Sequence, residues 1–221
     1  MKLYLVRHGE AEHNVGEYYV NEKKSDLTET GRKQAEAVAK RFEDIPIDLI
    51  ACSKFERAAQ TAAVILKKKK KCKVLYTPLL NEKRFPSEFT GQKGESEIVK
   101  RILEEIFKHR LDRKWHYSDE ENWFDLIGRV LKCMDYLEGL GKENILVVSH
   151  GLFIKTLCAV LLIQKSHHYR EWVKEYGEEV FYKVLFHTMS VFSMANTGVT
   201  VVEKEPEGNW RIRTYNDFSH L

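Results

Sequence analysis

Two histidine–glycine pairs follow apolar runs of the sequence. His8-Gly9 comes one residue after the run Leu3–Val6, and His150-Gly151 comes one residue after Ile145–Val148. Short apolar runs of this kind are typical of buried strands. In an open parallel sheet, ligands bind at the carboxyl ends of the strands. We therefore expect His8 and His150 to lie at one edge of a sheet, with each glycine allowing a sharp turn free of a Cβ clash.

Two arginines accompany these histidines. Arg7 directly precedes His8, and Arg57 lies at the start of a helix predicted after the strand 48–52. Guanidinium groups bind tetrahedral dianions through paired hydrogen bonds. Taken alone, Arg57 suits a surface ion pair with Glu56 better. Together with the two imidazoles, however, the arginines predict a binding site for a tetrahedral dianion.

The remaining pattern alternates strands with helices. Strands are predicted at 3–6, 48–52, 73–76 and 145–148, and helices at 31–42, 56–66, 95–107, 123–140 and 152–163. Thr28 is placed to cap the first of these helices. A hairpin of 199–202 and 210–213, turning at 206–208, closes the chain. This order predicts an α/β fold, a three-layer α/β/α sandwich with a mainly parallel sheet.

The domain organisation is expected to be simple. No stretch rich in Pro, Gly or Ser divides the chain, so we expect residues 1–221 to form a single domain. The segments at about 84–122 and 166–187 fit the alternation poorly. We expect both to be helical insertions that roof the active site.

Composition excludes several classes of protein. With 43% hydrophobic residues and a net charge of +3, the chain is neither disordered nor a strongly polyanion-seeking protein. The five lysines Lys67–Lys71 are interpreted as a solvated helix end. Four cysteines without a C-x-x-C pair favour reduced thiols, and the longest apolar run is far too short to span a membrane. We expect a cytoplasmic protein with neither nucleic acid nor membrane as a partner.

Five motifs in a fixed order resemble those of the histidine phosphatase superfamily, also called the phosphoglycerate mutase-like superfamily. The resemblance covers nearly the whole chain. The motifs are Arg7-His8-Gly9-Glu10 with Asn14, Leu27-Thr28-x-x-Gly31-x-x-Gln34-Ala35, Ser53-x-x-x-Arg57-Ala58-x-x-Thr61, Leu80-Asn81-Glu82 and His150-Gly151.

The resemblance implies a phosphomonoesterase that acts on a small phosphorylated substrate. His8 would attack phosphorus to form a phosphohistidine, with a backbone carbonyl expected to accept a hydrogen bond from its other ring nitrogen. Glu82 would act as the general acid and base. Because cations hold the phosphoryl oxygens, neither a metal nor a cofactor is expected. The implied substrate-binding residues are Arg7, Asn14, Arg57, His150 and Gly151, of which Arg7, Arg57 and His150 also serve catalysis.

Three alternatives stay open at this stage. Glu88, six residues after Glu82, is a second candidate for the acid. A phosphoglycerate mutase would use the same phosphohistidine but return the phosphoryl group to a second substrate oxygen. A non-catalytic binding module on the same fold is the third alternative. The sequence indicates neither the physiological substrate nor the oligomeric state.

Overall fold

The computed structural model describes residues 1–20, 25–163 and 169–221. Six of its strands form one sheet in the order β3-β2-β4-β1-β5-β6. The strands are β1 (Lys2–Arg7), β2 (Leu49–Cys52), β3 (Lys73–Tyr76), β4 (Asn144–Ser149), β5 (Val199–Lys204) and β6 (Trp210–Asp217).

The sheet is mainly parallel, as predicted. β1 and β2 both pair in parallel with β4, and β3 pairs in parallel with β2. β5 runs antiparallel to β1 and β6 antiparallel to β5, which confirms the closing hairpin. The second strand of this hairpin is longer than predicted, since it ends at Asp217 and not at 213.

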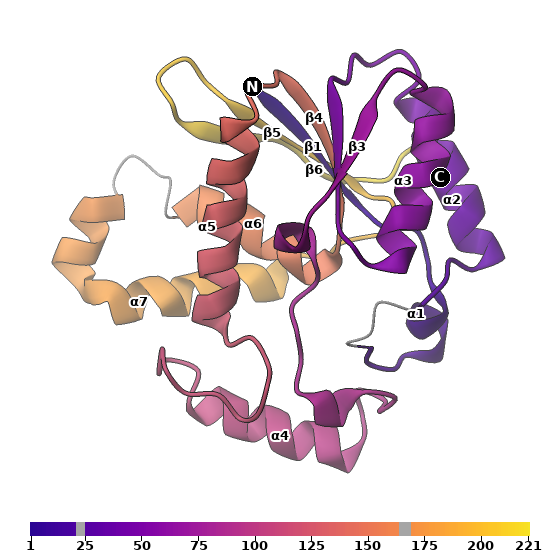
Figure 1. The fold of residues 1–221 in the computed structure, drawn as a ribbon. Coiled ribbons are helices and arrows are strands. Elements are labelled where there is room, and N and C mark those ends of the chain that lie inside the picture. The colour runs from indigo at the N-terminus through magenta and orange to yellow at the C-terminus, as the bar shows by residue number, and fades with distance from the viewer. Residues whose placement is uncertain (21–24, 164–168) are drawn as a thin grey trace.

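Helices cover both faces of the sheet (Figure 1). Side chains of α2 (Glu29–Arg41) and α3 (Glu56–Lys68) pack on one face, and those of α5 (Trp123–Gly139), α6 (Gly151–Ile163) and α7 (Tyr169–Val191) pack on the other. These layers confirm the predicted three-layer sandwich. The expected cap is also present, because Thr28 Oγ1 accepts a hydrogen bond from the backbone N–H of Gly31 at 3.0 Å.

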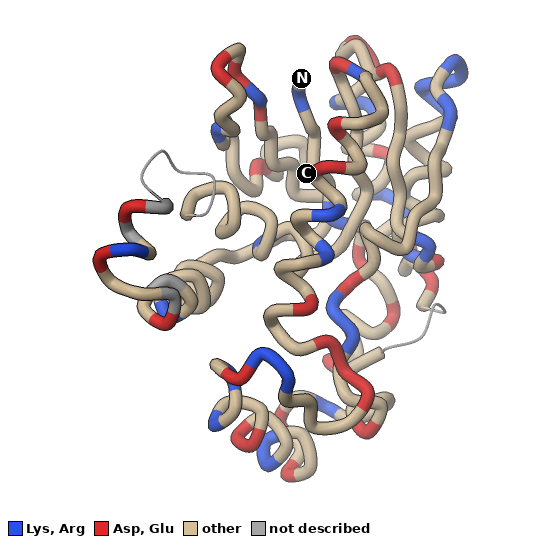
Figure 2. Tube along the Cα trace, turned by 60° about the vertical axis from the view of Figure 1, so that its left-hand side comes forward, with Lys and Arg blue, Asp and Glu red and all other residues tan. Residues whose placement is uncertain are grey.

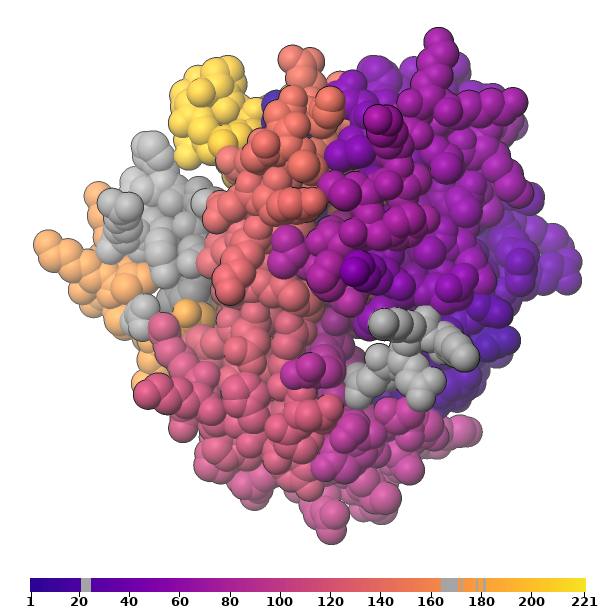
Figure 3. Space-filling model, in the orientation of Figure 1, coloured from indigo at the N-terminus to yellow at the C-terminus, as the bar shows by residue number. Residues whose placement is uncertain are grey.

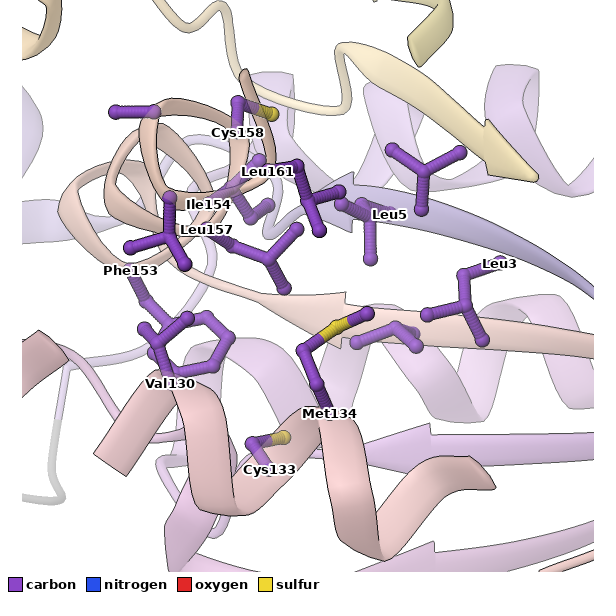
Figure 4. Close-up of a cluster of buried hydrophobic side chains, with 14 of the residues drawn as sticks. Leu3, Leu5, Val130, Cys133, Met134, Phe153, Ile154, Leu157, Cys158 and Leu161 are labelled. Atoms are coloured by element: carbon purple, nitrogen blue, oxygen red, sulfur yellow. The ribbon is translucent and has the colours of Figure 1, made fainter. Parts of the chain in front are cut away.

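The alternation of side chains along β1 and β4 explains the two core clusters. Leu3 and Leu5 of β1 point into the cluster with α5 and α6, whereas Val6 joins α2 and α3 on the opposite face. Figure 4 shows Leu3 and Leu5 in one cluster with Leu157 of α6 and Met134 of α5. Burying apolar side chains on both faces fixes the strand register, and the strand ends with it.

The segment 84–122 lies beyond the end of the sheet. It contains the short helix η2 (Ser87–Phe89) and α4 (Glu97–Lys108), and forms the lower end of the molecule in Figures 1 and 3. Phe89, Val99 and Ile102 form a small cluster of their own there. This placement, away from the helical layers, suits the roof expected from the sequence.

The second expected insertion falls partly outside the described residues, which leave out 166–168. Its described part belongs to α7, a helix that continues to Val191 and is interrupted at Gly177, with φ 80° and ψ 159°. We propose that the chain from 1 to 221 is one domain, since its first and last strands lie in the same sheet.

Outside the two expected insertions, two short helices of the described residues were not predicted. They are α1 (Glu12–Gly16) and η1 (Pro78–Leu80), which have too few residues to show an apolar period. The lysine run does lie at the end of α3, and its lysines are exposed as expected except for Lys69, which is half-buried. Its Nζ donates to the backbone carbonyls of Glu43 and Ile45. Within the described parts of the chain, no helix is long and apolar enough to cross a membrane.

Candidate active site

The two histidines meet at the carboxyl ends of β1 and β4. Arg7 and Ser149 are register partners in the parallel pair, so the residues that follow them leave the sheet side by side. The ring centroids of His8 and His150 lie 5.1 Å apart. His8 is 2% exposed and His150 is fully buried. The structure thus confirms that both imidazoles lie at one edge of the sheet.

His8 is held in one tautomer. Its Nδ1 lies 2.7 Å from the carbonyl oxygen of Gly9, which only accepts hydrogen bonds, so Nδ1 carries the proton. This confirms the expected backbone acceptor. The lone pair of Nε2 then faces Arg57, whose Nε donates to it at 3.2 Å. Burial, and next the charges of Arg57 and Arg7, hold the pKa of His8 well below its ordinary value. His8 is therefore neutral at pH 7, with Nε2 available as a nucleophile.

Arg57 does not form the surface ion pair considered above. Its side chain is 2% exposed at the start of α3, beside the ring of Phe55, whereas Glu56 is exposed and accepts from Gln60. Burial lowers the pKa of Arg57 to about 10, which leaves the group charged at neutral pH. Arg7 is anchored by its Nη1, which donates to the carbonyl oxygen of Met194.

Three buried nitrogens lack a hydrogen-bond partner. Over the described residues, they are the buried side-chain nitrogen and oxygen atoms left without one: Arg7 Nε, Arg57 Nη1 and His150 Nδ1. An unpartnered buried polar group costs about 1–3 kcal/mol. All three belong to residues gathered around His8. This set of nitrogens suits a ligand that carries several oxygens and negative charge, as a phosphoryl group does.

A relay of hydrogen bonds fixes the orientation of His150. Its Nε2 lies 2.7 Å from Ser53 Oγ, and Ser53 Oγ lies 2.9 Å from Asn81 Oδ1. The amide oxygen of Asn81 only accepts, so the Ser53 hydroxyl donates to it and accepts from His150 Nε2. Nδ1 of neutral His150 is then unprotonated. To donate from Nδ1 to a bound phosphoryl oxygen, His150 must take up a proton.

Glu82 lies in the site and Glu88 does not. Glu82 lines a cavity of about 330 Å³ together with His8, Arg7 and Arg57. Its carboxylate accepts from the backbone N–H groups of Leu152 at 3.1 Å and Phe153 at 3.0 Å, in the first turn of α6. Glu88 is exposed and accepts from Ser118 Oγ. The geometry therefore favours Glu82 as the acid.

Helix α1 adds two side chains to the same cavity, Asn14 and His13. Asn14 Nδ2 lies 3.0 Å from His13 Nε2, so one amide hydrogen donates to His13 and the other stays available for a ligand. Burial, and then Arg57 and Arg7, lower the pKa of His13 to about 3. Sequence reasoning missed His13, whose only signal was its place directly before Asn14.

The two glycines differ in what they permit. A Cβ on Gly9 would lie 2.5 Å from the carbonyl oxygen of Gly31, so the expected clash is confirmed there. At Gly151 the expectation was wrong, because the nearest atom to such a Cβ would be Arg7 Nε at an ordinary 3.5 Å. Because Gly151 has no side chain, the space next to Arg7 Nε, one of the three unpartnered nitrogens, stays open. Among the described residues, no group of three or more His, Cys, Asp or Glu is gathered as a metal site.

Acid is expected to destabilise the folded protein through these imidazoles. Burial, and then the charge of Arg57, keep the pKa values of His8 and His150 well below ordinary. In the unfolded chain each titrates near about pH 6.5. Below that pH the unfolded state binds protons that the folded state does not. The free energy of unfolding should therefore keep this contribution above pH ~6.5 and lose it progressively as the pH is lowered below that value. Urea unfolding at a series of pH values measures it.

The control variants distinguish the contribution of these two histidines from that of His116. The double variant His8→Asn, His150→Gln should show a shallower fall than the wild type. His116→Gln should not, because the hydrogen bond to Asp125 at 2.7 Å raises the pKa of His116. Its protonation therefore favours the folded state. An equally steep fall in the double variant would contradict the assignment.

Comparison with known proteins identifies the family. The family model of the histidine phosphatase superfamily, branch 1, matches residues 3–178. This chain belongs to that superfamily. The match spans β1 through α6, and so includes every residue described above at the site's centre.

Individual relatives of this histidine phosphatase align with it over its whole length. A probable phosphatase of Schizosaccharomyces pombe is 29% identical over 224 residues, covering 100% of this chain and 95% of its own. A metal-independent phosphoserine phosphatase of Arabidopsis thaliana is 27% identical over 227 residues, covering 100% and 83%. Among solved structures, Bacillus stearothermophilus YhfR superposes with a TM-score of 0.78 at 24% identity, covering 99% and 98%, which supports the fold.

Proposed function

We propose that this histidine phosphatase hydrolyses phosphomonoesters through a phosphohistidine at His8. The observation that carries the proposal is the set of unpartnered nitrogens around a neutral His8 whose Nε2 is unprotonated. A phosphoryl group seated among them accepts from Arg7 Nε and Arg57 Nη1, accepts from His150 Nδ1 once His150 has taken up a proton, and presents phosphorus to Nε2. The named phosphatases that match the whole chain support the same activity.

The reaction proceeds in two displacements. In the first, Nε2 of His8 forms a bond to phosphorus while the bond from phosphorus to the leaving oxygen breaks, and Glu82 gives that oxygen its proton. In the second, water attacks phosphorus, the carboxylate of Glu82 takes a proton from the water, and the bond to Nε2 breaks. Inorganic phosphate is released and both groups return to their starting states.

The other residues stabilise charge and position the ester. Arg7 and Arg57 neutralise the developing charge on the phosphoryl oxygens, as preorganised donors in a buried site do effectively. His150, once protonated at Nδ1, adds a third positive donor. Asn14 offers its remaining amide hydrogen. The open space at Gly151 lets an oxygen approach Arg7 Nε.

Activity is expected to persist in excess EDTA. In many phosphoryl-transfer enzymes divalent metal ions neutralise the phosphoryl charge, and here Arg7, Arg57 and His150 carry it. Initial rates of phosphate release, measured with enzyme dialysed against EDTA and with untreated enzyme, should agree within about twofold. A loss of activity restored by Mg²⁺ or Zn²⁺ would count decisively against the mechanism.

The test of the function itself measures two products together. Purified enzyme is given alkyl phosphates, sugar phosphates and 3-phosphoglycerate, and both free phosphate and 2-phosphoglycerate are quantified. Hydrolysis is expected to release one phosphate per alcohol formed. Formation of 2-phosphoglycerate without net phosphate would instead identify a mutase, and no turnover of any ester would favour a binding module.

The cysteines and the distribution of charge bear on the compartment and the partner of the enzyme. All four cysteines are free thiols, and Cys52, Cys133 and Cys158 are buried, which suits a reducing compartment. Figure 2 shows Lys and Arg interspersed with Asp and Glu along the chain. We propose a cytoplasmic enzyme whose partner is a small phosphorylated molecule and not a nucleic acid.

A further inference from the structure

A second cavity lies beside the phosphate site. It has a volume of about 430 Å³ and is walled by helices α4, α5, α6 and α7. Most of its lining is apolar: Phe85, Ile106, Phe107, Trp123, Phe186 and Met189. None of the described residues that line it is acidic. A concave apolar space of this size is typical of a small-molecule site.

The cavity begins next to the proposed general acid. Phe85 borders both this cavity and the one that contains His8. Leu152 lines it too, and the backbone N–H of Leu152 donates to Glu82. Lys155, another lining residue, interacts electrostatically with both Glu82 and Arg7. The leaving oxygen of an ester must lie against the general acid. The alcohol part of the ester, which is attached to that oxygen, would therefore lie next to this cavity.

Two of the lining cations form part of the wall. Lys83 is 6% exposed and its ammonium lies over the rings of Phe85 and Trp123, 5.0 and 5.3 Å from their centroids. Arg110 lies 3.8 Å from the ring centroid of Phe107 and donates to the Phe107 carbonyl at 2.7 Å. Their hydrocarbon stems add apolar surface. Their positive charges also attract a negatively charged phosphate ester that approaches the site.

Some of the apolar lining is left uncovered. Phe107 is 63% exposed and Leu103 is 38% exposed, although both line the cavity. When an apolar ligand covers an exposed apolar group beside a polar catalytic site, the burial of that surface stabilises the complex. A small polar leaving group, such as that of phosphoserine, does not provide such cover.

We propose that this cavity receives the leaving group, and that the preferred substrates are phosphate monoesters whose alcohol carries an alkyl chain or an aromatic ring. The proposal rests on the proposed function, because it places the reacting phosphorus at His8. It deepens that function by naming the substrate class.

A series of n-alkyl phosphates from ethyl to octyl tests the proposal. The kcat/KM for phosphate release is expected to rise about three- to fourfold for each added methylene until the cavity is filled, as burial of a methylene predicts. A series with no rise beyond propyl phosphate would overturn the proposal.

Two exposed apolar residues of α4 provide matched variants. Phe107 lines the cavity, whereas Ile98, 44% exposed on the same helix, does not. Phe107→Ser is expected to lower the ratio of kcat/KM for octyl over ethyl phosphate about tenfold, and Ile98→Ser to keep the wild-type ratio. Because both side chains are exposed, neither variant threatens the fold. Equal ratios in the two variants would count against the cavity as the leaving-group site.

Binding of alkylphosphonates separates failure of this proposal from failure of the proposed function. Phosphonates cannot be hydrolysed at the phosphorus–carbon bond, so calorimetry measures their affinity whether or not the protein is an enzyme. Octylphosphonate is expected to bind at least about a hundredfold more tightly than ethylphosphonate. Equal affinities together with phosphate release from ethyl phosphate would refute the cavity's role alone. Tight octylphosphonate binding without any ester hydrolysis would refute the function alone.

Discussion

The variant His8→Ala is expected to lose turnover by at least about 10⁴-fold, because removing a nucleophile removes the covalent route itself. The fold should remain, since His8 belongs to neither of the two large apolar clusters that hold the sheet and its helices. Loss of the imidazole leaves Arg57 Nε without its acceptor, a local and polar change. Phosphate release by purified variant and wild type, with circular dichroism of both, measures the effect.

The covalent intermediate gives a second measure of the same role. Wild-type enzyme quenched during turnover of a ³²P-labelled ester should carry acid-labile, alkali-stable label on the peptide containing His8. His13→Ala is the matched control, because His13 lines the same cavity with its ring centroid 5.9 Å from that of His8. That variant should still acquire label. Turnover at the wild-type rate in His8→Ala, or label on another residue, would remove His8 from this role.

Glu82→Gln is expected to slow hydrolysis of an alkyl phosphate far more than hydrolysis of p-nitrophenyl phosphate. A general acid matters most for a poor leaving group such as an alkoxide, and its contribution is typically about 10²–10⁴-fold. An activated phenolate leaves with little help. Glutamine keeps the size of the side chain, but its carbonyl oxygen replaces only one of the two carboxylate oxygens, so it can accept from Phe153 or from Leu152 and not from both. That loss is the same for both substrates, so the difference between the substrates isolates proton transfer.

Glu88→Gln supplies the matched comparison. Glu88 lies on the exposed side of the roof, hydrogen-bonded to Ser118. Its loss should change both substrates by a similar factor of less than about threefold. Initial rates for both substrates in both variants decide the question. If the alkyl-specific loss appears in Glu88→Gln instead, Glu88 is the acid and the motif assignment in this loop is wrong.

Much of the fold was predictable because its strands and helices have strong periodic signals. The apolar runs before His8 and His150 became the neighbouring strands β1 and β4, and the rule that ligands bind at strand ends then brought the two imidazoles together. Once the resemblance implied that His8 is the nucleophile, a backbone acceptor for its other ring nitrogen was predictable, although which nitrogen carries the proton was not.

The hydrogen-bond partners of the second histidine were not predictable in this way. Ser53 and Asn81 both belong to motifs identified in the sequence. Nothing in their spacing, however, shows that Ser53 accepts a hydrogen bond from His150 and donates one to Asn81. Such relays depend on how loops after different strands meet in space. Asn81 ends the short helix η1, an element too brief to leave a pattern. The geometry that favours Glu82 over Glu88, the contact of Glu82 with α6, was likewise not visible in the sequence.

The unpartnered nitrogens around His8 also bear on how the enzyme would run inside a cell. In the proposed mechanism they bind the oxygens of a phosphoryl group and do not contact the group that is attached to it. Inorganic phosphate, the product, therefore fits the same nitrogens as the substrate and competes with it. Esters that fill the apolar cavity hold an advantage over phosphate that a small polar ester lacks. Such an enzyme would slow as cellular phosphate accumulates and speed up when phosphate is scarce, a product inhibition that ties its output to phosphate supply.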